Sequence, residues 1–259
     1  MMLTYDSMLF GSGDSPPRMI KVTVGQDVGK PKVFHVHVGV LCHHSAFFAA
    51  ALTGAFPEAQ TNSVALPEDD PVRFEQILCW MYGQQDIFPM QTDKTMADIF
   101  DFLVLADKLL VEPSPADYIA KTYMRSLICG DRVHTAEDGV RTTGVLCAEN
   151  IRRAYDLPFA KPIAKAFAKH SVPFYMDTMD QKFLEDKDFR FEKEAREVHG
   201  YAADVLFFTA EALRAASEQG QRPRTIAYLC PDHECITELF VRNPFHTGAT
   251  WSEVPTRGW

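Results

Sequence analysis

The stretch SVALPEDDPVRFEQILCWMYG, residues 63–83, decides the fold of the first half of the chain. Its first four residues suit a short strand, and the remainder has the pattern of a helix with both ends marked. Asp69 or Asp70 can cap this helix, Pro71 favours its first turn, and Gly83 ends it. Apolar side chains recur between these marks at helical spacing, at Phe74, Ile77, Leu78 and Met81. The stretch therefore predicts a strand followed by an amphipathic helix.

The residues before this stretch change from a strand pattern to a helix pattern. Residues 19–24 and 33–38 are short, β-prone and separated by turn residues, which predicts a hairpin. Ser45 can cap an Ala- and Phe-rich helix, and Gly54 is expected to close it in the left-handed conformation common at C-terminal caps. The first half of the chain is thus expected to combine a three-stranded sheet with helices.

Helical patterns dominate the residues that follow. Residues 96–111 are apolar on nearly every side, which predicts a helix packed between neighbours, and Pro115 permits a further helix to about Ile128. Later helices are expected at 150–155 and 162–169. A long helix is expected within 192–218, with one apolar face made of Val205, Phe208, Ala212 and Leu213. A last short strand is expected over residues 225–230. The predicted fold class is α+β and predominantly helical.

Composition shifts divide the sequence into five segments. They are a flexible N-terminal arm (1–18), a first domain (19–130), a polar linker (131–144), a helical C-terminal domain (145–229) and a C-terminal tail (230–259).

Charge and composition exclude several classes of function. With 46% hydrophobic residues, 259 residues can bury a core, and 26 Lys and Arg against 35 Asp and Glu leave a net charge of −9. Nucleic-acid binding is not expected, because the basic field that it requires is missing. Neither a signal peptide nor a membrane span is indicated, so we expect no membrane partner and a protein of the cytoplasm, the nucleus or both, with its six cysteines reduced.

Two clusters contain residue types that catalytic centres use. The run Cys42-His43-His44-Ser45 places a thiol, two imidazoles and a hydroxyl together, but adjacent side chains on a helix do not face each other. We interpret Ser45 as a helix cap beside core residues. Glu68 and its two following aspartates are explained by capping of the next helix. Neither cluster is therefore interpreted as catalytic.

One group near the end of the chain has zinc-ligand chemistry. Cys230, His233 and Cys235 could supply two thiolates and an imidazole, with His246 as a fourth ligand. A single close pair leaves two interpretations open, a zinc knuckle or ordinary tail residues. No other cofactor is expected.

Many separated segments resemble, in this order, a BTB/POZ domain, most closely that of fungal-type members. They include Val22-Thr23-Val24-Gly25, Phe34-His35-Val36-His37, Ser45-Ala46-Phe47-Phe48, Gly54-Ala55-Phe56-Pro57-Glu58, Trp80-Met81-Tyr82-Gly83 and Leu105-Ala106-Asp107-Lys108-Leu109-Leu110. The resemblance covers about residues 19–128. It implies a three-stranded sheet against a helical cluster, a structural role for His37, and Phe47, Phe48, Leu78 and Trp80 in the core.

The resemblance also implies a protein-interaction module without catalysis, so the protein is predicted not to be an enzyme. Many such domains bind a cullin scaffold through a hydrophobic residue followed two positions later by glutamate, and Phe56-Pro57-Glu58 matches that motif. The leading hypothesis is a substrate adaptor of a cullin-RING ubiquitin ligase. Phe56 packing inside its own domain is the competing interpretation.

The second hypothesis is a homo- or hetero-oligomeric scaffold, transcription-linked and without a ligase role. Many BTB domains form homodimers through a pocket lined by two charges. Met19 and Val38 occupy those two positions here. An enzyme built around the C-terminal Cys/His group is the remaining hypothesis.

Overall fold

The chain divides into two compact units, residues 1–166 and 167–259. The structure is a computed structural model, and it describes residues 17–27, 29, 31–84, 87–88, 92–129, 134–135, 139–140, 145–177, 189–218, 226–229 and 236–239. The five segment bounds given above stay a prediction.

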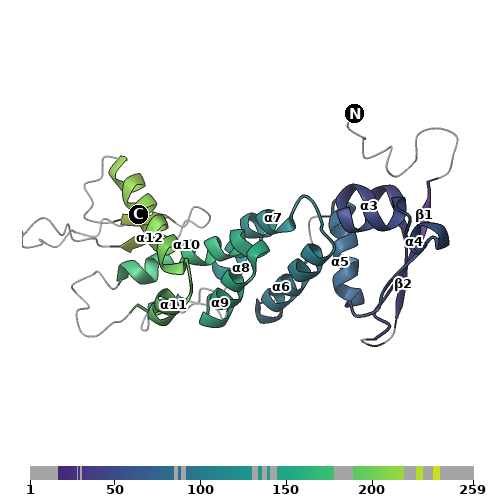
Figure 1. The fold of residues 1–259 in the computed structure, drawn as a ribbon. Helices are drawn as coiled ribbons and strands as arrows, with labels where there is room; N and C mark the ends of the chain where they lie inside the picture. The colour runs from purple at the N-terminus through teal and green to yellow at the C-terminus, as the bar shows by residue number, and fades with distance from the viewer. Residues whose placement is uncertain are drawn as a thin grey trace, which may run out of the picture. The chain divides into compact units, whose positions relative to one another are not determined.

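A three-stranded mixed sheet forms the start of the first unit (Figure 1). It is built from β1 (Met19–Val24), β2 (Lys32–His37) and β3 (Ser63–Leu66), in the order β2-β1-β3. β1 pairs antiparallel with β2 and parallel with β3. Because side chains alternate across a strand, Ile20, Val22 and Val24 are buried on one face. The predicted hairpin and third strand are confirmed.

The same unit contains the helices α2 (Val38–His44), α3 (Ala46–Thr53), α4 (Pro57–Thr61), α5 (Pro71–Met81) and α6 (Thr92–Lys108). α2 contacts β2, α3 and α5, α4 contacts α3 and β3, and α6 packs against α5. The ring of Phe74 on α5 contacts both Phe34 of β2 and Phe48 of α3, which joins the two layers. Phe48 is fully buried as predicted, whereas Phe47, Leu78 and Trp80 are only half-buried.

The helix ends show which capping predictions hold. The Asp70 carboxylate accepts the Val72 N–H at 2.9 Å, and the Ser45 hydroxyl accepts the Phe48 N–H at 3.1 Å, so both predicted caps are confirmed. The conformation predicted for Gly54 is wrong, because its φ of −84° and ψ of −169° are extended. Glycine is needed there for space, since a Cβ would lie 2.7 Å from the Ala50 carbonyl oxygen.

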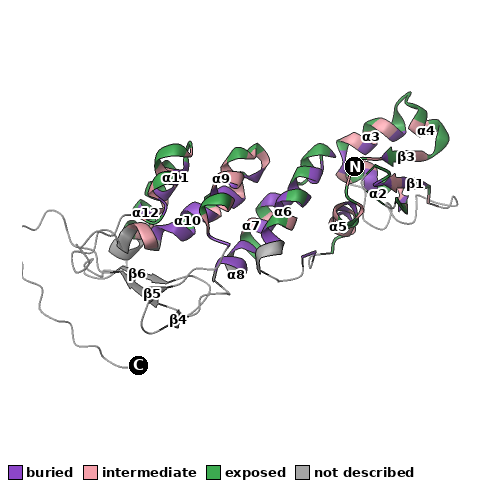
Figure 2. Cartoon of the chain, turned by 90° about the horizontal axis from the view of Figure 1, so that it is seen from below, coloured by how far each residue is buried: buried purple, intermediate pink, exposed green. Residues whose placement is uncertain are grey.

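The helix α6 is buried along much of its length, as Figure 2 shows. It ends at Lys108, three residues before the predicted end. The helix expected over 115–128 is two helices, α7 (Pro115–Thr122) and α8 (Met124–Cys129). A two-stranded sheet of β4 (His134–Thr135) and β5 (Gly139–Val140) follows, and the sequence did not predict it.

The helix α9 (Ala148–Asp156) is tied to α6 within the first unit. The Arg153 guanidinium lies 2.6 Å from the Asp101 carboxylate and 4.9 Å from the centre of the Phe100 ring. A short 3-10 helix, η1 (Pro158–Ala160), also packs against α6. α9 was predicted over a slightly shorter range.

The second unit has a helical part and a two-stranded sheet. The helix α10 (Lys161–Asp177) runs across the division between the units. It is followed by α11 (Glu192–Glu197), α12 (Tyr201–Glu218), β6 (Ile226–Leu229) and β7 (Ile236–Leu239). The Tyr201 hydroxyl donates to Ser171 at 2.8 Å inside this unit, and burial raises the pKa of that hydroxyl well above its ordinary range.

The long helix expected within 192–218 is confirmed as α12, and Gly200, with a φ of +86°, separates it from the shorter α11. The predicted apolar face of α12 is covered unevenly, because Val205 is 2% exposed and Leu213 is 37% exposed.

Candidate partner-binding site

The short helix α4 presents the predicted motif, and long-range hydrogen bonds hold it in place. Arg18 lies directly before β1, and its guanidinium donates to Asn62 Oδ1 at 2.5 and 3.0 Å and to the Ala59 carbonyl at 3.1 Å. Asn62 ends α4 in the left-handed conformation, with φ of +50°. The helix is thus fastened to the start of the sheet, although its own five residues would not stay helical in isolation.

Phe56 is the N-cap residue of α4, and Pro57 follows it at the first helical position. The Phe56 side chain is 56% exposed, which makes it one of the most exposed large apolar residues among those described. Its ring edge lies against Gly54, where an added Cβ would be 3.1 Å from Phe56 Cδ2. Part of the ring therefore packs within the domain, and the rest faces solvent.

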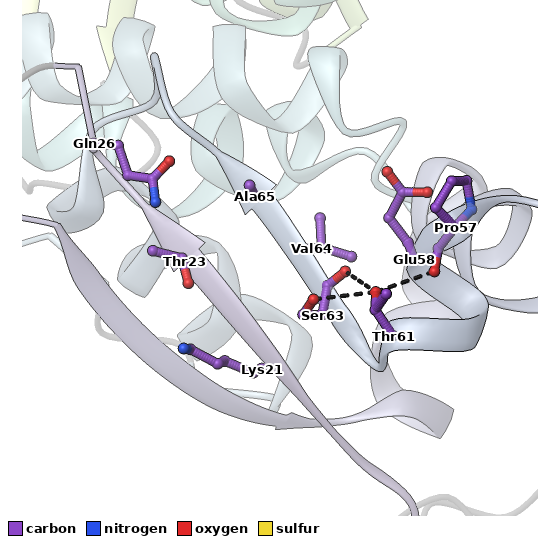
Figure 3. Close-up of a pocket in the computed structure, with 9 residues that line it drawn as sticks. All are labelled: Lys21, Thr23, Gln26, Pro57, Glu58, Thr61, Ser63, Val64 and Ala65. Carbon is purple, nitrogen blue, oxygen red and sulfur yellow. Dashed lines mark hydrogen bonds between the residues drawn. The ribbon is translucent and has the colours of Figure 1, made fainter.

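Glu58 lies in the first turn of the same helix and is half-buried. It borders a shallow trough of about 320 Å³, whose floor is the outer side of β3 at Ser63 and Ala65 (Figure 3). Lys21 stands on the opposite side of this trough. Among the residues that the structure describes, neither Lys21 nor Glu58 forms an ion pair with another side chain.

The arrangement of Cys42, His44 and Ser45 supports a structural role. Ser45 is 1% exposed, and its hydroxyl donates to the Leu109 carbonyl at 2.5 Å while it caps α3. Burial raises the pKa of the Cys42 thiol, which disfavours the thiolate that a nucleophile needs. Burial also lowers the pKa of His44, whose Nδ1 lies 3.2 Å from the Glu112 carbonyl oxygen.

His37 has the structural position expected of it. It is the N-cap residue of α2, and its Nδ1 lies 2.7 Å from the Tyr82 hydroxyl. The contact connects the end of β2 to the end of α5.

The predicted zinc ligands Cys230, His233, Cys235 and His246 lie outside the described residues. Within the described part of the chain, no group of three or more His, Cys, Asp or Glu residues is placed to hold a metal ion. Zinc binding therefore stays a prediction. Metal analysis of the purified protein tests it, with Cys230→Ser expected to remove stoichiometric zinc.

Sequence reasoning found Phe56 and Glu58 through a resemblance but missed the residues that fix them. Arg18 and Asn62 are 44 positions apart, and nothing local in the sequence connects them. The only signal in the sequence was that position 62 is an asparagine, a residue type enriched in the αL conformation.

Residues 21–116 match the BTB/POZ domain family. The three-stranded mixed sheet with its helices is the architecture of that family, so this part of the chain is a BTB/POZ domain. BTB/POZ domains are protein-interaction modules and are generally not enzymatic. No curated protein shows significant similarity to the chain. None of the described helices has the length and apolar character needed to cross a membrane.

Proposed function

We propose that the protein is a substrate adaptor of a cullin-RING ubiquitin ligase, acting in the cytoplasm or nucleus. In this proposal Phe56 and Glu58 dock on the cullin, and the helical region after the BTB/POZ domain selects the substrate. The exposed Phe56 side chain carries the proposal, because a fixed helical turn holds it outward two positions before Glu58.

The energetics are consistent with a useful contact. Full burial of a phenylalanine contributes about 1.5–3 kcal/mol, and roughly half of that remains available because the ring is already partly covered. Glu58 can add a charge-assisted hydrogen bond to a donor of the partner. Arg18 and Asn62 would keep the loss of conformational entropy on binding small, because α4 is already ordered.

Titration of the full chain with a cullin N-terminal fragment tests the proposal. Phe56→Ala should weaken binding about four- to tenfold, since it removes about 0.8–1.5 kcal/mol of burial. Glu58→Gln should weaken it further when combined with that change. Val72→Ala is the matched control, because Val72 is 55% exposed on α5 and lies outside the motif.

Two results would remove the adaptor proposal. One is undetectable binding of the cullin fragment by the folded chain. The other is binding that Phe56→Ala leaves unchanged. A stable oligomer that never binds cullin would favour the scaffold alternative.

A further inference from the structure

The trough on the outer face of the sheet exists because the outward residues of β3 are small (Figure 3). Side chains alternate along a strand, and Val64 and Leu66 are buried on the inner face, so Ser63 and Ala65 remain as the floor. Short side chains on the floor let the backbone of another chain approach closely. The volume of about 320 Å³ is near the lower end of the range for ligand pockets, about 300–1,000 Å³, and suits a short extended segment.

The two walls of the trough are β1 and α4, and backbone hydrogen bonds fix them in place. The Lys21 N–H donates to the Asn62 carbonyl at 3.2 Å, which joins β1 to the end of α4. At the other end of β1, the Gly25 N–H donates to the Leu66 carbonyl at 3.0 Å, which joins β1 to the floor. The trough is therefore preformed, and a partner that enters it loses little affinity to ordering of these elements.

The walls differ in charge. Lys21 is exposed on the β1 wall, and Glu58 is half-buried on the α4 wall. The β1 wall also carries the Thr23 hydroxyl and, just after the strand, the Gln26 amide. Within the described part of the chain, neither of these two side chains forms a hydrogen bond. An ammonium and two neutral donors along one wall are the groups that bind a carboxylate.

We propose that Lys21 is a specificity-determining residue of the docking surface and binds an acidic side chain of the same partner that covers Phe56. The proposal rests on the adaptor function, because it names what that partner carries beyond its contacts with the motif. The segment of the partner that crosses the trough places its carboxylate on the β1 wall and a donor group beside Glu58. An ion pair at such a rim fixes register and speeds association more than it adds affinity.

Titration of the full chain with the cullin N-terminal fragment measures the contribution of Lys21. Lys21→Met removes the charge and should weaken binding about two- to fivefold, the effect of one exposed ion pair. Lys21→Arg keeps the charge and should bind like the wild type. Lys21→Glu should weaken binding more than Lys21→Met does, because repulsion replaces attraction.

Lys121→Glu is the matched control. It makes the same change in net charge at an exposed lysine of α7, outside the trough, and it should leave binding unchanged. Salt gives a second measurement. The difference in affinity between wild type and Lys21→Met should shrink as NaCl rises from about 50 to 500 mM, because salt screens an exposed ion pair.

The outcomes separate this proposal from the adaptor function. If the fragment binds through Phe56 but binds wild type and Lys21→Glu equally, the role of Lys21 is overturned and the adaptor function stands. Equal losses for Lys21→Glu and Lys121→Glu, or a loss that salt does not reduce, would also overturn it. Undetectable binding of the fragment to the wild-type chain would overturn both. Circular dichroism should show that all the variants are folded.

Discussion

Removal of the Ser45 hydroxyl should destabilise the BTB/POZ domain strongly. In Ser45→Ala, the N-cap of α3 is lost, which costs about 0.5–2 kcal/mol. The Leu109 carbonyl and the Phe48 N–H lose their partner in a buried setting, and an unsatisfied buried group costs about 1–3 kcal/mol. We expect the free energy of unfolding to fall by about 2–4 kcal/mol, since the two contributions overlap.

Urea unfolding followed by circular dichroism measures this loss. Ser114→Ala is the matched control, because the exposed Ser114 hydroxyl caps α7 at 3.4 Å and has no second bond among the described residues. The control should cost only about 0.5–1 kcal/mol. The buried Ser45 hydroxyl links α3 to the end of α6. This role would be refuted if Ser45→Ala lowered the free energy of unfolding no more than Ser114→Ala does.

Three further predictions concern single residues. Gly54→Ala should lower the free energy of unfolding by about 1–3 kcal/mol, measured by urea unfolding, because the new Cβ meets a backbone oxygen and the Phe56 ring; an unchanged midpoint would contradict this. Gly25→Ala should lower the free energy of unfolding at least as much, since Gly25 has a φ of +82° and an added Cβ would lie 2.7 Å from Pro71. A thermal melting midpoint equal to that of the wild type would contradict this. Burial lowers the pKa of His44 in the folded state. As the pH falls, the unfolded chain therefore takes up the His44 proton at a higher pH than the folded chain does, and the free energy of unfolding should decrease below about pH 6.5. His44→Gln should flatten that part of the curve, and identical pH profiles of variant and wild type would speak against the assigned cause.

The sequence predicts the elements whose ends are marked by local chemistry. Asp70 and Pro71 specify the start of α5, because a carboxylate cap and a proline at the first turn have one favourable placement. Gly54 was located correctly but given the wrong conformation. A glycine can be required either for a left-handed backbone conformation or because another backbone atom lies too close for a Cβ. Only the position of the Ala50 carbonyl oxygen shows that the second reason applies to Gly54.

The sequence could not predict which side of an all-round apolar helix is covered. Periodicity identifies the apolar positions on α12 but does not show what packs against each of them, so it cannot tell that Val205 is buried while Leu213 is 37% exposed. The candidate site shows the same limit. Phe56 and Glu58 were found through their motif, whereas the bonds from Arg18 to Asn62 depend on the parallel pairing of β1 with β3.

Hydrogen exchange of the full chain, with and without the cullin N-terminal fragment, tests the central claim most directly. The account predicts slower exchange across residues 54–62 when the fragment is present, because Phe56 and α4 become covered. Equal exchange in that segment under saturating fragment, or protection confined to other parts of the chain, would contradict it.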